Sequence, residues 1–402
     1  MKEKGREKVS FLLMLAVGLI FWSGGNLQAQ SDVFFGHPLG STNILGIYSP
    51  LASAAGETIL SFPGPYTAFL NPATMTLTTG FNLAISTRWS HAFSKNNYNY
   101  DNELASYKRT TFYPEFVGIM AGNGKWRIAL GYSLPEEYNW PKIFNYNDFD
   151  EQDGKLHNFG LSVARQITDK VSIGLSAAYR TGQINHNYYT DYSEGERYWE
   201  IDIHSLVFDF GLIWEVNQTV TLGLAIQPPY KISVKCYTYY ELLEDGDITD
   251  PVRDKGSFKL PVVLTVSSRL KILDNLNFFS DVSYWDWSSS EMSHYSPYLE
   301  YIYPNQSEKD AVRFSTGIDY AINLKSTFDD KMHILAGYIH DPQTANFPAY
   351  GTHPSYDYLT FGLGLELKKF QIGASARLPL AAVDEQGLIY SSRFQLGIEL
   401  TL

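Results

Sequence analysis

Charged side chains recur at alternate positions along several short segments of this chain, and they limit the chemistry open to it. The set comprises Arg88, Arg127, Arg180, Asp209, Arg269, Asp281, Arg313, Asp319, Glu366, Arg377, Arg393 and Glu399. An arginine can bind a ligand carboxylate through two parallel hydrogen bonds. The same arginine can instead form a structural ion pair with a neighbouring acid. Both interpretations stay open at this stage.

Serine hydrolase chemistry needs a serine activated by a histidine partner. The nearest candidates are His204 with Ser205, and Ser293 with His294. Adjacent residues of a strand point to opposite faces, so the first pair is a poor dyad. The second pair lies in a long predicted loop, and no G-x-S-x-G nucleophile elbow is present. We therefore expect no enzymatic activity.

Metal chemistry has two weak candidates. One is an acidic run that resembles half a calcium loop and consists of Asp148, Asp150, Glu151 and Asp153. The glycine of this run, Gly154, comes one position too late for such a loop. The other is a group of histidines without a convincing metal-ligand spacing: His333, His340 and His353. We expect no metal and no cofactor.

The composition limits the classes of partner that the chain can bind. The chain of 402 residues is 44% hydrophobic and 15% aromatic, with 29 tyrosines and a net charge of -12. A nucleic-acid partner is disfavoured, because phosphate binding needs clustered lysine and arginine. Cys236 is the only cysteine, so an intrachain disulfide is excluded.

Residues 1–29 have the pattern of an export signal. A basic start that includes Lys2, Lys4 and Arg6 precedes the apolar run from Phe11 to Trp22. That run is short for a membrane-spanning helix, and Leu27-Gln28-Ala29 is a plausible cleavage site. We predict a cleaved signal peptide.

From Phe81 onward apolar and polar residues alternate with the period of a strand. In 81–93, for example, Ile85 and Trp89 lie on one face and Arg88 on the other. Fourteen strands are predicted near 81–93, 110–121, 125–134, 156–167, 171–185, 198–215, 219–235, 257–272, 276–288, 309–323, 331–340, 356–367, 369–379 and 391–402. Many are about as long as the roughly 9–11 residues of a tilted membrane strand.

The connections alternate between short turns and long loops. The predicted long loops are 94–108, 135–155, 187–197, 236–256, 289–308 and 341–355. Short turns at one end and long loops at the other are typical of outer-membrane barrels. Residues 81–402 are therefore predicted to be an all-β, transmembrane antiparallel β-barrel of about 14 strands. The alternative is a soluble all-β protein whose apolar face forms the core.

Residues 30–80 lack this alternation and are rich in Gly, Pro, Ala and Ser. A short helix is expected to begin within Ser53–Glu57, and Asn71-Pro72-Ala73 forms a tight turn before the first strand. A prefix of this length without strands needs a place to pack, so we predict a plug inside the barrel. The alternative is a simple turn into the first strand.

Three features resemble the FadL/TodX family of outer-membrane transporters for long-chain fatty acids and other hydrophobic compounds. Asn71-Pro72-Ala73 resembles the hatch motif of the family. Leu260-Pro261, Asp281-Val282-Ser283-Tyr284 and Trp287-Ser288 resemble its leucine-proline and aspartate-tyrosine-tryptophan-serine pattern. The predicted strand count agrees with the fourteen strands of the family, and the resemblance spans nearly the whole mature chain.

The resemblance implies an outer-membrane barrel, with the hatch at 30–80, that admits hydrophobic or amphipathic molecules without a chemical step. Expected partners are such a ligand and membrane lipid, and we expect a monomer. The ligand would first meet loop aromatics, which equally suit an outer aromatic girdle: Tyr138, Trp140, Tyr188, Tyr189, Tyr239 and Tyr240. Eleven lumen-facing polar residues are ligand candidates: Arg88, Arg127, Arg180, Arg269, Asp281, Arg313, Asp319, Glu366, Arg377, Arg393 and Glu399. The alternative on the same fold is a scaffold or secretion component whose long loops bind proteins.

Overall fold

The computed structural model describes the following residues: 48–96, 105–137, 140–145, 148–190, 195–242, 252–289, 291–293, 310–324, 330–342, 355–380 and 389–402. The predicted signal peptide, 1–29, lies outside them, as does the first part of the predicted hatch. No helix in these ranges has the length and apolar character needed to cross a membrane.

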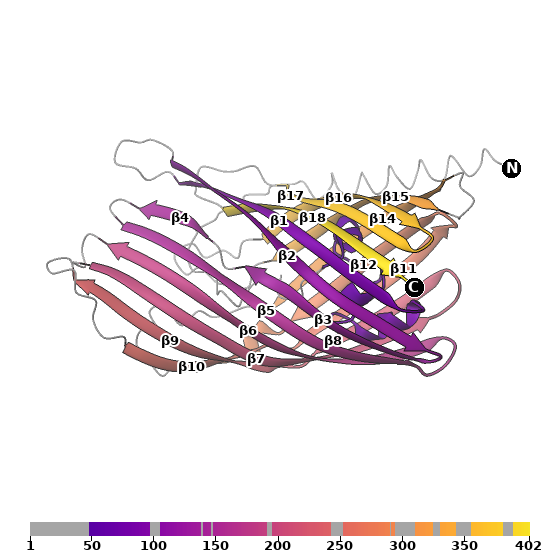
Figure 1. The fold of residues 1–402 in the computed structure, drawn as a ribbon, viewed down its shortest axis with the longest axis horizontal. Helices are drawn as coiled ribbons and strands as arrows, with labels where there is room; N and C mark the ends of the chain where they lie inside the picture. Colours follow the sequence, from indigo (N-terminus) through magenta and orange to yellow (C-terminus); the bar gives the residue numbers. More distant parts are fainter. Residues whose placement is uncertain are drawn as a thin grey trace.

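One antiparallel sheet closes on itself, because β1 (Asn82–Asn96) pairs with both β2 (Ala105–Asn123) and β18 (Ile389–Thr401). The strands between are β3 (Trp126–Glu137), β4 (Trp140–Asn145), β5 (Asp148–Gln166), β6 (Val171–Thr190), β7 (Gly195–Glu215), β8 (Val220–Gln227), β9 (Tyr230–Leu242), β10 (Val252–Leu260), β11 (Val263–Leu273), β12 (Leu276–Trp285), β13 (Glu291–Ser293), β14 (Ala311–Asn323), β15 (Lys331–Pro342), β16 (Ser355–Leu367) and β17 (Phe370–Pro379). Figure 1 shows these strands wound obliquely around the barrel.

The chain crosses the barrel wall fourteen times. Four of these crossings are each divided into two strands, which gives the eighteen described strands. The interrupted crossings are β3 with β4, β8 with β9, β10 with β11, and β12 with β13. Pro228 and Pro229 separate β8 from β9, and Pro261 stands between β10 and β11. Proline has no N–H to donate to a ladder, which explains these two breaks. The fourteen-stranded barrel is therefore confirmed.

The outer face of the barrel is apolar, and the charged and polar side chains of the strands face inward, together with buried apolar ones. On β1, the exposed fractions of Ile85 and Trp89 are 45% and 53%, whereas Ser86 and Arg88 are buried. Leu161 on β5 is likewise 48% exposed. An apolar outer face of this kind suits lipid and excludes the soluble all-β alternative.

Residues 48–80, called the lumen segment here, lie inside this ring. They comprise helix α2 (Pro50–Ala54) and the 3-10 helices η2 (Pro65–Thr67) and η3 (Pro72–Leu77). Helix α2 contacts β15 to β18, η2 contacts β1 to β3, and η3 contacts β3 and β5 to β7. Figure 1 shows the segment as indigo coils near the short-turn end of the barrel. Contacts on so many strands place the segment in the lumen.

The predicted short helix is displaced towards the N-terminus. Ser49 caps α2, since its hydroxyl accepts a hydrogen bond from the Ala52 N–H, and the helix ends at Ala54. The sequence prediction began a helix in Ser53–Glu57, and that prediction was wrong. Gly56 and Glu57 instead adopt positive φ angles of 75° and 57°, which a helix does not allow.

Several predicted long loops are largely strand. β1 and β2 extend into 94–108, β3 to β5 occupy most of 135–155, and β6, β7, β9 and β10 extend into 187–197 and 236–256. On β5 and β6 the outward positions towards the long loops, such as Asp153, Lys155 and Gln183, are polar. The extensions lose the alternation that marks a lipid-facing strand, so the sequence pattern failed to reveal them.

Candidate functional site

Glycines on the inner wall allow the lumen segment to approach the strands closely. A Cβ atom at Gly211 would overlap the side-chain oxygen of Asn71. A Cβ at Gly317, on the other side of the barrel, would overlap the carbonyl oxygen of Ala55. The wall and the segment are therefore complementary in shape at two distant points.

Asn71 joins the lumen segment to the wall. Its Oδ1 accepts a hydrogen bond from the Ala73 N–H at 3.2 Å, which caps η3. Its Nδ2 donates to the carbonyl oxygens of Leu212 and Leu224, at 3.4 and 3.2 Å. Pro72 occupies the first helical position, where its missing N–H costs nothing. The Asn71-Pro72-Ala73 motif thus contacts β7 and β8 and also begins a helix, which is more than a turn.

Other neutral hydrogen bonds tie the segment to further strands. The Tyr66 hydroxyl donates to the carbonyl oxygens of Ile85 and Ile398, at 3.0 and 3.2 Å. The Ser162 hydroxyl donates to the Ala68 carbonyl at 2.6 Å. Because these partners come from β1, β18 and β5, the segment is held on several sides at once.

Glu57 supplies an ionic connection. Its Oε1 accepts from Nη1 of Arg377 at 3.0 Å, and its Oε2 accepts from Nη2 of Arg313. All three side chains are buried. Burial alone would raise the pKa of Glu57, but the charges of Arg377 and Arg313 outweigh it and hold this pKa below its usual range. Ionised Glu57 therefore links the segment to β14 and β17.

A second ion pair lies on the same side of the lumen. Arg88 contacts Glu115 at 3.1 Å, and the Gln395 side-chain amide donates to Glu115 at 2.7 Å. A register shift in the β1–β2 pairing lets both Glu115 and its neighbour Phe116 point inward. Arg393, on β18, is half-buried.

Two predicted charges on the other arc have neutral partners. Arg180 donates to the Tyr230 hydroxyl at 2.7 Å and to Oδ1 of Asn158 at 3.4 Å. Asp209 accepts from the Gln227 amide at 2.7 Å. These bonds favour a structural role for both charges.

Nearer the short turns, Asp281 accepts the backbone N–H of Ile59 at 2.8 Å. Asp319 and Glu366 contact the two nitrogens of His333, at 2.8 and 3.2 Å. Asp281 therefore holds the lumen segment, whereas the other two acids join neighbouring strands.

Three candidates remain at this end of the lumen. Arg127 donates to the Thr78 carbonyl at 3.0 Å. Glu399 is buried, and its carboxylate lies next to Gly64. Arg269, on β11, is partly exposed. Most candidates therefore contact the segment or a neighbouring strand.

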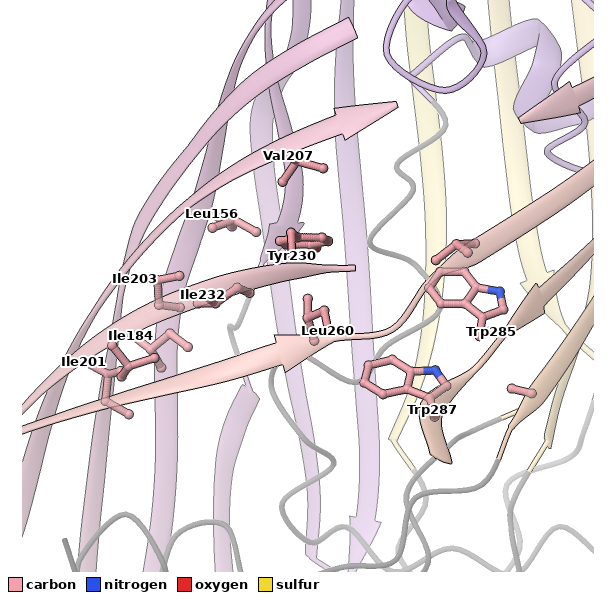
Figure 2. Packing of buried hydrophobic residues seen from close by; sticks show 13 residues of the cluster. Leu156, Ile184, Ile201, Ile203, Val207, Tyr230, Ile232, Leu260, Trp285 and Trp287 are labelled. Atoms are coloured by element: carbon pink, nitrogen blue, oxygen red, sulfur yellow. The ribbon is translucent and has the colours of Figure 1, made fainter. Parts of the chain in front are cut away.

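Buried apolar side chains gather on the arc opposite Glu57, mainly on β5 to β13. They form one cluster: Leu156, Ile184, Ile201, Ile203, Val207, Tyr230, Ile232, Val234, Leu260, Val263, Trp285, Trp287 and Ala311. The rings of Trp285 and Trp287 are parallel, with centroids 6.4 Å apart. Figure 2 shows Leu260 between Tyr230 and these two rings, beside the break between β10 and β11. The arc of β5 to β12 is therefore mainly apolar, although Arg180 and Asp209 also lie on it, and the opposite arc holds the ion pairs of Glu57 and Glu115.

The predicted loop aromatics are placed differently from the expectation. Tyr188 and Tyr189 belong to β6, Tyr239 and Tyr240 to β9, and Trp140 to β4. The prediction that these positions lie in loops was wrong, because the strands continue beyond the apolar belt. Tyr138 lies outside the described residues.

The geometry gives the serine and metal candidates no support. His204 faces outward, with Nδ1 3.0 Å from the Tyr179 hydroxyl, whereas Ser205 is buried. The acidic run at Asp148 lies in β5, so the loop predicted there was wrong. Within the described ranges, no group of three His, Cys, Asp or Glu residues could hold a metal ion. His294 and His353 are outside those ranges.

Three acids beside the arginines of this arc were not predicted from the sequence: Glu57, Glu115 and Asp341. Asp341 lies 3.9 Å from Arg313. Glu57 stands alone among small and apolar residues, which could have marked it as a buried charge. Glu115 follows a proline that shifts the alternation by one residue, and Asp341 fell in a predicted loop.

Comparison with known proteins agrees with this architecture. The model of the family described as outer membrane protein transport protein (OMPP1/FadL/TodX) matches residues 49–368. No curated protein matches the chain. A FadL homologue from Pseudomonas aeruginosa is 13% identical with a TM-score of 0.66, and the match covers 88% of this chain and 98% of that one.

Two toluene transporters have similar folds. TodX from P. putida is 14% identical with a TM-score of 0.65, and TbuX from Ralstonia pickettii is 15% identical with a TM-score of 0.62. Each match covers 89% of this chain and 99% of the other. These structural similarities concern the fold.

Proposed function

Because the chain belongs to the outer-membrane transport protein family OMPP1/FadL/TodX, we propose that it admits small hydrophobic or amphipathic molecules, such as long-chain fatty acids, through the barrel. The family is one of transport proteins and not of enzymes. The observation that carries the proposal is the lumen segment, whose contacts reach β1 to β3, β5 to β7 and β15 to β18.

The two arcs of the lumen fit an amphipathic ligand. An alkyl chain would lie against the apolar cluster around Trp285 and Trp287. A carboxylate would be drawn to the arginines of the opposite arc, of which Arg393 is half-buried. A plain hydrocarbon would use the first surface alone. The same lumen thus accepts either ligand class, and the arginines add a preference for acids.

Passage would require the lumen segment to move, because its backbone and side chains occupy the path through the barrel. Capture at the outer rim, a local rearrangement of the segment and diffusion then complete transport. No step changes a covalent bond, and no cofactor takes part.

The test is uptake of labelled oleate, with labelled hexadecane in parallel, by cells that lack their own transporters of this kind. Cells expressing the chain should take up label above the empty-vector control. The replacement Trp287→Ala should lower uptake of both labels, whereas Trp214→Ala, on the outer face, should leave uptake unchanged. No uptake of either label by a correctly inserted barrel would overturn the proposal and favour the scaffold alternative.

A further inference from the structure

A basic patch lies on the outer face of β9 and β10, in a chain whose net charge is -12. Its members alternate along both strands, so they share one face: Lys231, Lys235, Arg253, Lys255 and Lys259. Four of them are exposed and Lys259 is half-buried. We call these five residues the basic stripe.

The stripe begins where the apolar belt ends. Below the break at Pro228, the outward residues Leu222, Leu224 and Ile226 of β8 are apolar. On the next crossing, Leu264 and Val266 of β11 are also exposed and apolar, with Val266 at 52%. The outer face thus changes from apolar to cationic across the breaks. Such a change marks the boundary between acyl chains and headgroups at the long-loop side.

The register brings like charges together. Lys255 lies directly opposite Lys235, and Lys259 lies directly opposite Lys231. Like charges facing each other across an antiparallel pair destabilise it. The flanking strands place one acid next to each pair, Asp202 opposite Lys235 and Glu291 opposite Lys259. Glu200 shares the outer face of β7 with Asp202 and lies opposite Tyr237. Three acids beside five cations still leave an excess of positive charge.

We propose that the basic stripe binds phosphate-bearing lipid headgroups of the leaflet on the long-loop side. A bound phosphate would bridge Lys235 and Lys255 and remove their repulsion. The acyl chains of the same lipid would lie along Leu224 and Val266, directly below. Lysine suits this position, because its alkyl stem covers apolar surface while its ammonium reaches the headgroups. The stripe would thereby fix the height and rotation of this wall, independently of what passes through the lumen.

Binding of bisphosphorylated lipid A to the purified full-length chain in nonionic detergent tests the proposal, with native mass spectrometry as the readout. The comparison lipid is lipid A without its phosphates. Each cation near a charged lipid surface changes affinity by about fivefold, so K231Q/K235Q/K255Q should lose on the order of 100-fold. The control K125Q/K170Q/K369Q removes three exposed lysines at the short turns and should bind as the wild type does.

The wild type should also prefer the phosphorylated lipid, and an excess of inorganic phosphate should not displace it. Equal binding by the stripe variant and the wild type, or no preference for the phosphorylated lipid, would overturn the proposal. Displacement by inorganic phosphate would also overturn it, because the stripe would then be a free-phosphate site. A heat-induced gel shift confirms that each variant barrel is folded.

Discussion

Replacing Glu57 by glutamine should loosen the lumen segment. The change keeps the shape of the side chain but leaves Arg313 and Arg377 without the anion that both contact. Removing one partner of a buried ion pair costs about 3–5 kcal/mol. Glutamine can still accept one hydrogen bond, so the lower value applies. At about 3 kcal/mol, the population of the released segment rises roughly 150-fold.

Planar bilayer recording measures this population as the fraction of time that the barrel conducts ions. The wild type should remain closed except for rare, short openings. Glu57→Gln should open far more often, with the conductance of each opening unchanged, since the wall of the barrel is the same. Glu215→Gln removes one negative charge at the short-turn end of β7 and should behave as the wild type does.

A Glu57→Gln barrel that shows the heat-induced gel shift and still opens as rarely as the wild type would refute this reasoning. The neutral hydrogen bonds and the glycine contacts would then hold the segment without help from the ion pairs. A gain in conductance for Glu215→Gln as large as that for Glu57→Gln would refute it too, because net charge would then be the cause.

Three further predictions concern the same barrel. The lowered pKa of Glu57 means that its contribution is complete above the ordinary glutamate range and is lost as the pH falls through the lowered value. Openings should therefore rise below about pH 4, and this rise at low pH should be absent in Glu57→Gln. Gly211→Leu would drive a side chain into Asn71 and should raise the resting conductance, whereas unchanged conductance would show that β7 can yield. Leu161→Arg puts a charge on the lipid face and should lower the free energy of unfolding by about 2–4 kcal/mol in urea titrations of the barrel in liposomes, against a smaller loss for Leu161→Ala.

The sequence predicted the barrel well, because a strand with lipid on one face and the lumen on the other alternates apolar and polar residues. The alternation alone assigns Ile85 and Trp89 to the outside and Arg88 to the inside. The predicted strands erred beyond the belt, where β5 to β7 continue for many residues with polar positions on their outer face. With polar residues on both faces of these strands, apolar and polar residues no longer alternate, and the sequence pattern does not reveal the strands.

The site was harder to predict than the wall. Sequence alone placed Arg313 and Arg377 inside, yet their shared partner, Glu57, lies in a segment without periodicity and far away along the chain. Its position depends on the path of the lumen segment, which is set by contacts with glycines such as Gly317. Long-range packing of this kind has no local sequence signal. The breaks at Pro228 and Pro261 were readable in principle, because proline inside a predicted strand interrupts its ladder.

The central claim is that residues at the N-terminal end close a preformed barrel. Deleting residues 31–75 and recording ion conductance in a planar bilayer tests it most directly. The account predicts a folded barrel with a large, permanent conductance, beside a wild type that stays closed. A folded deletion variant with the low conductance of the wild type would contradict it, because some other part of the chain would then close the lumen.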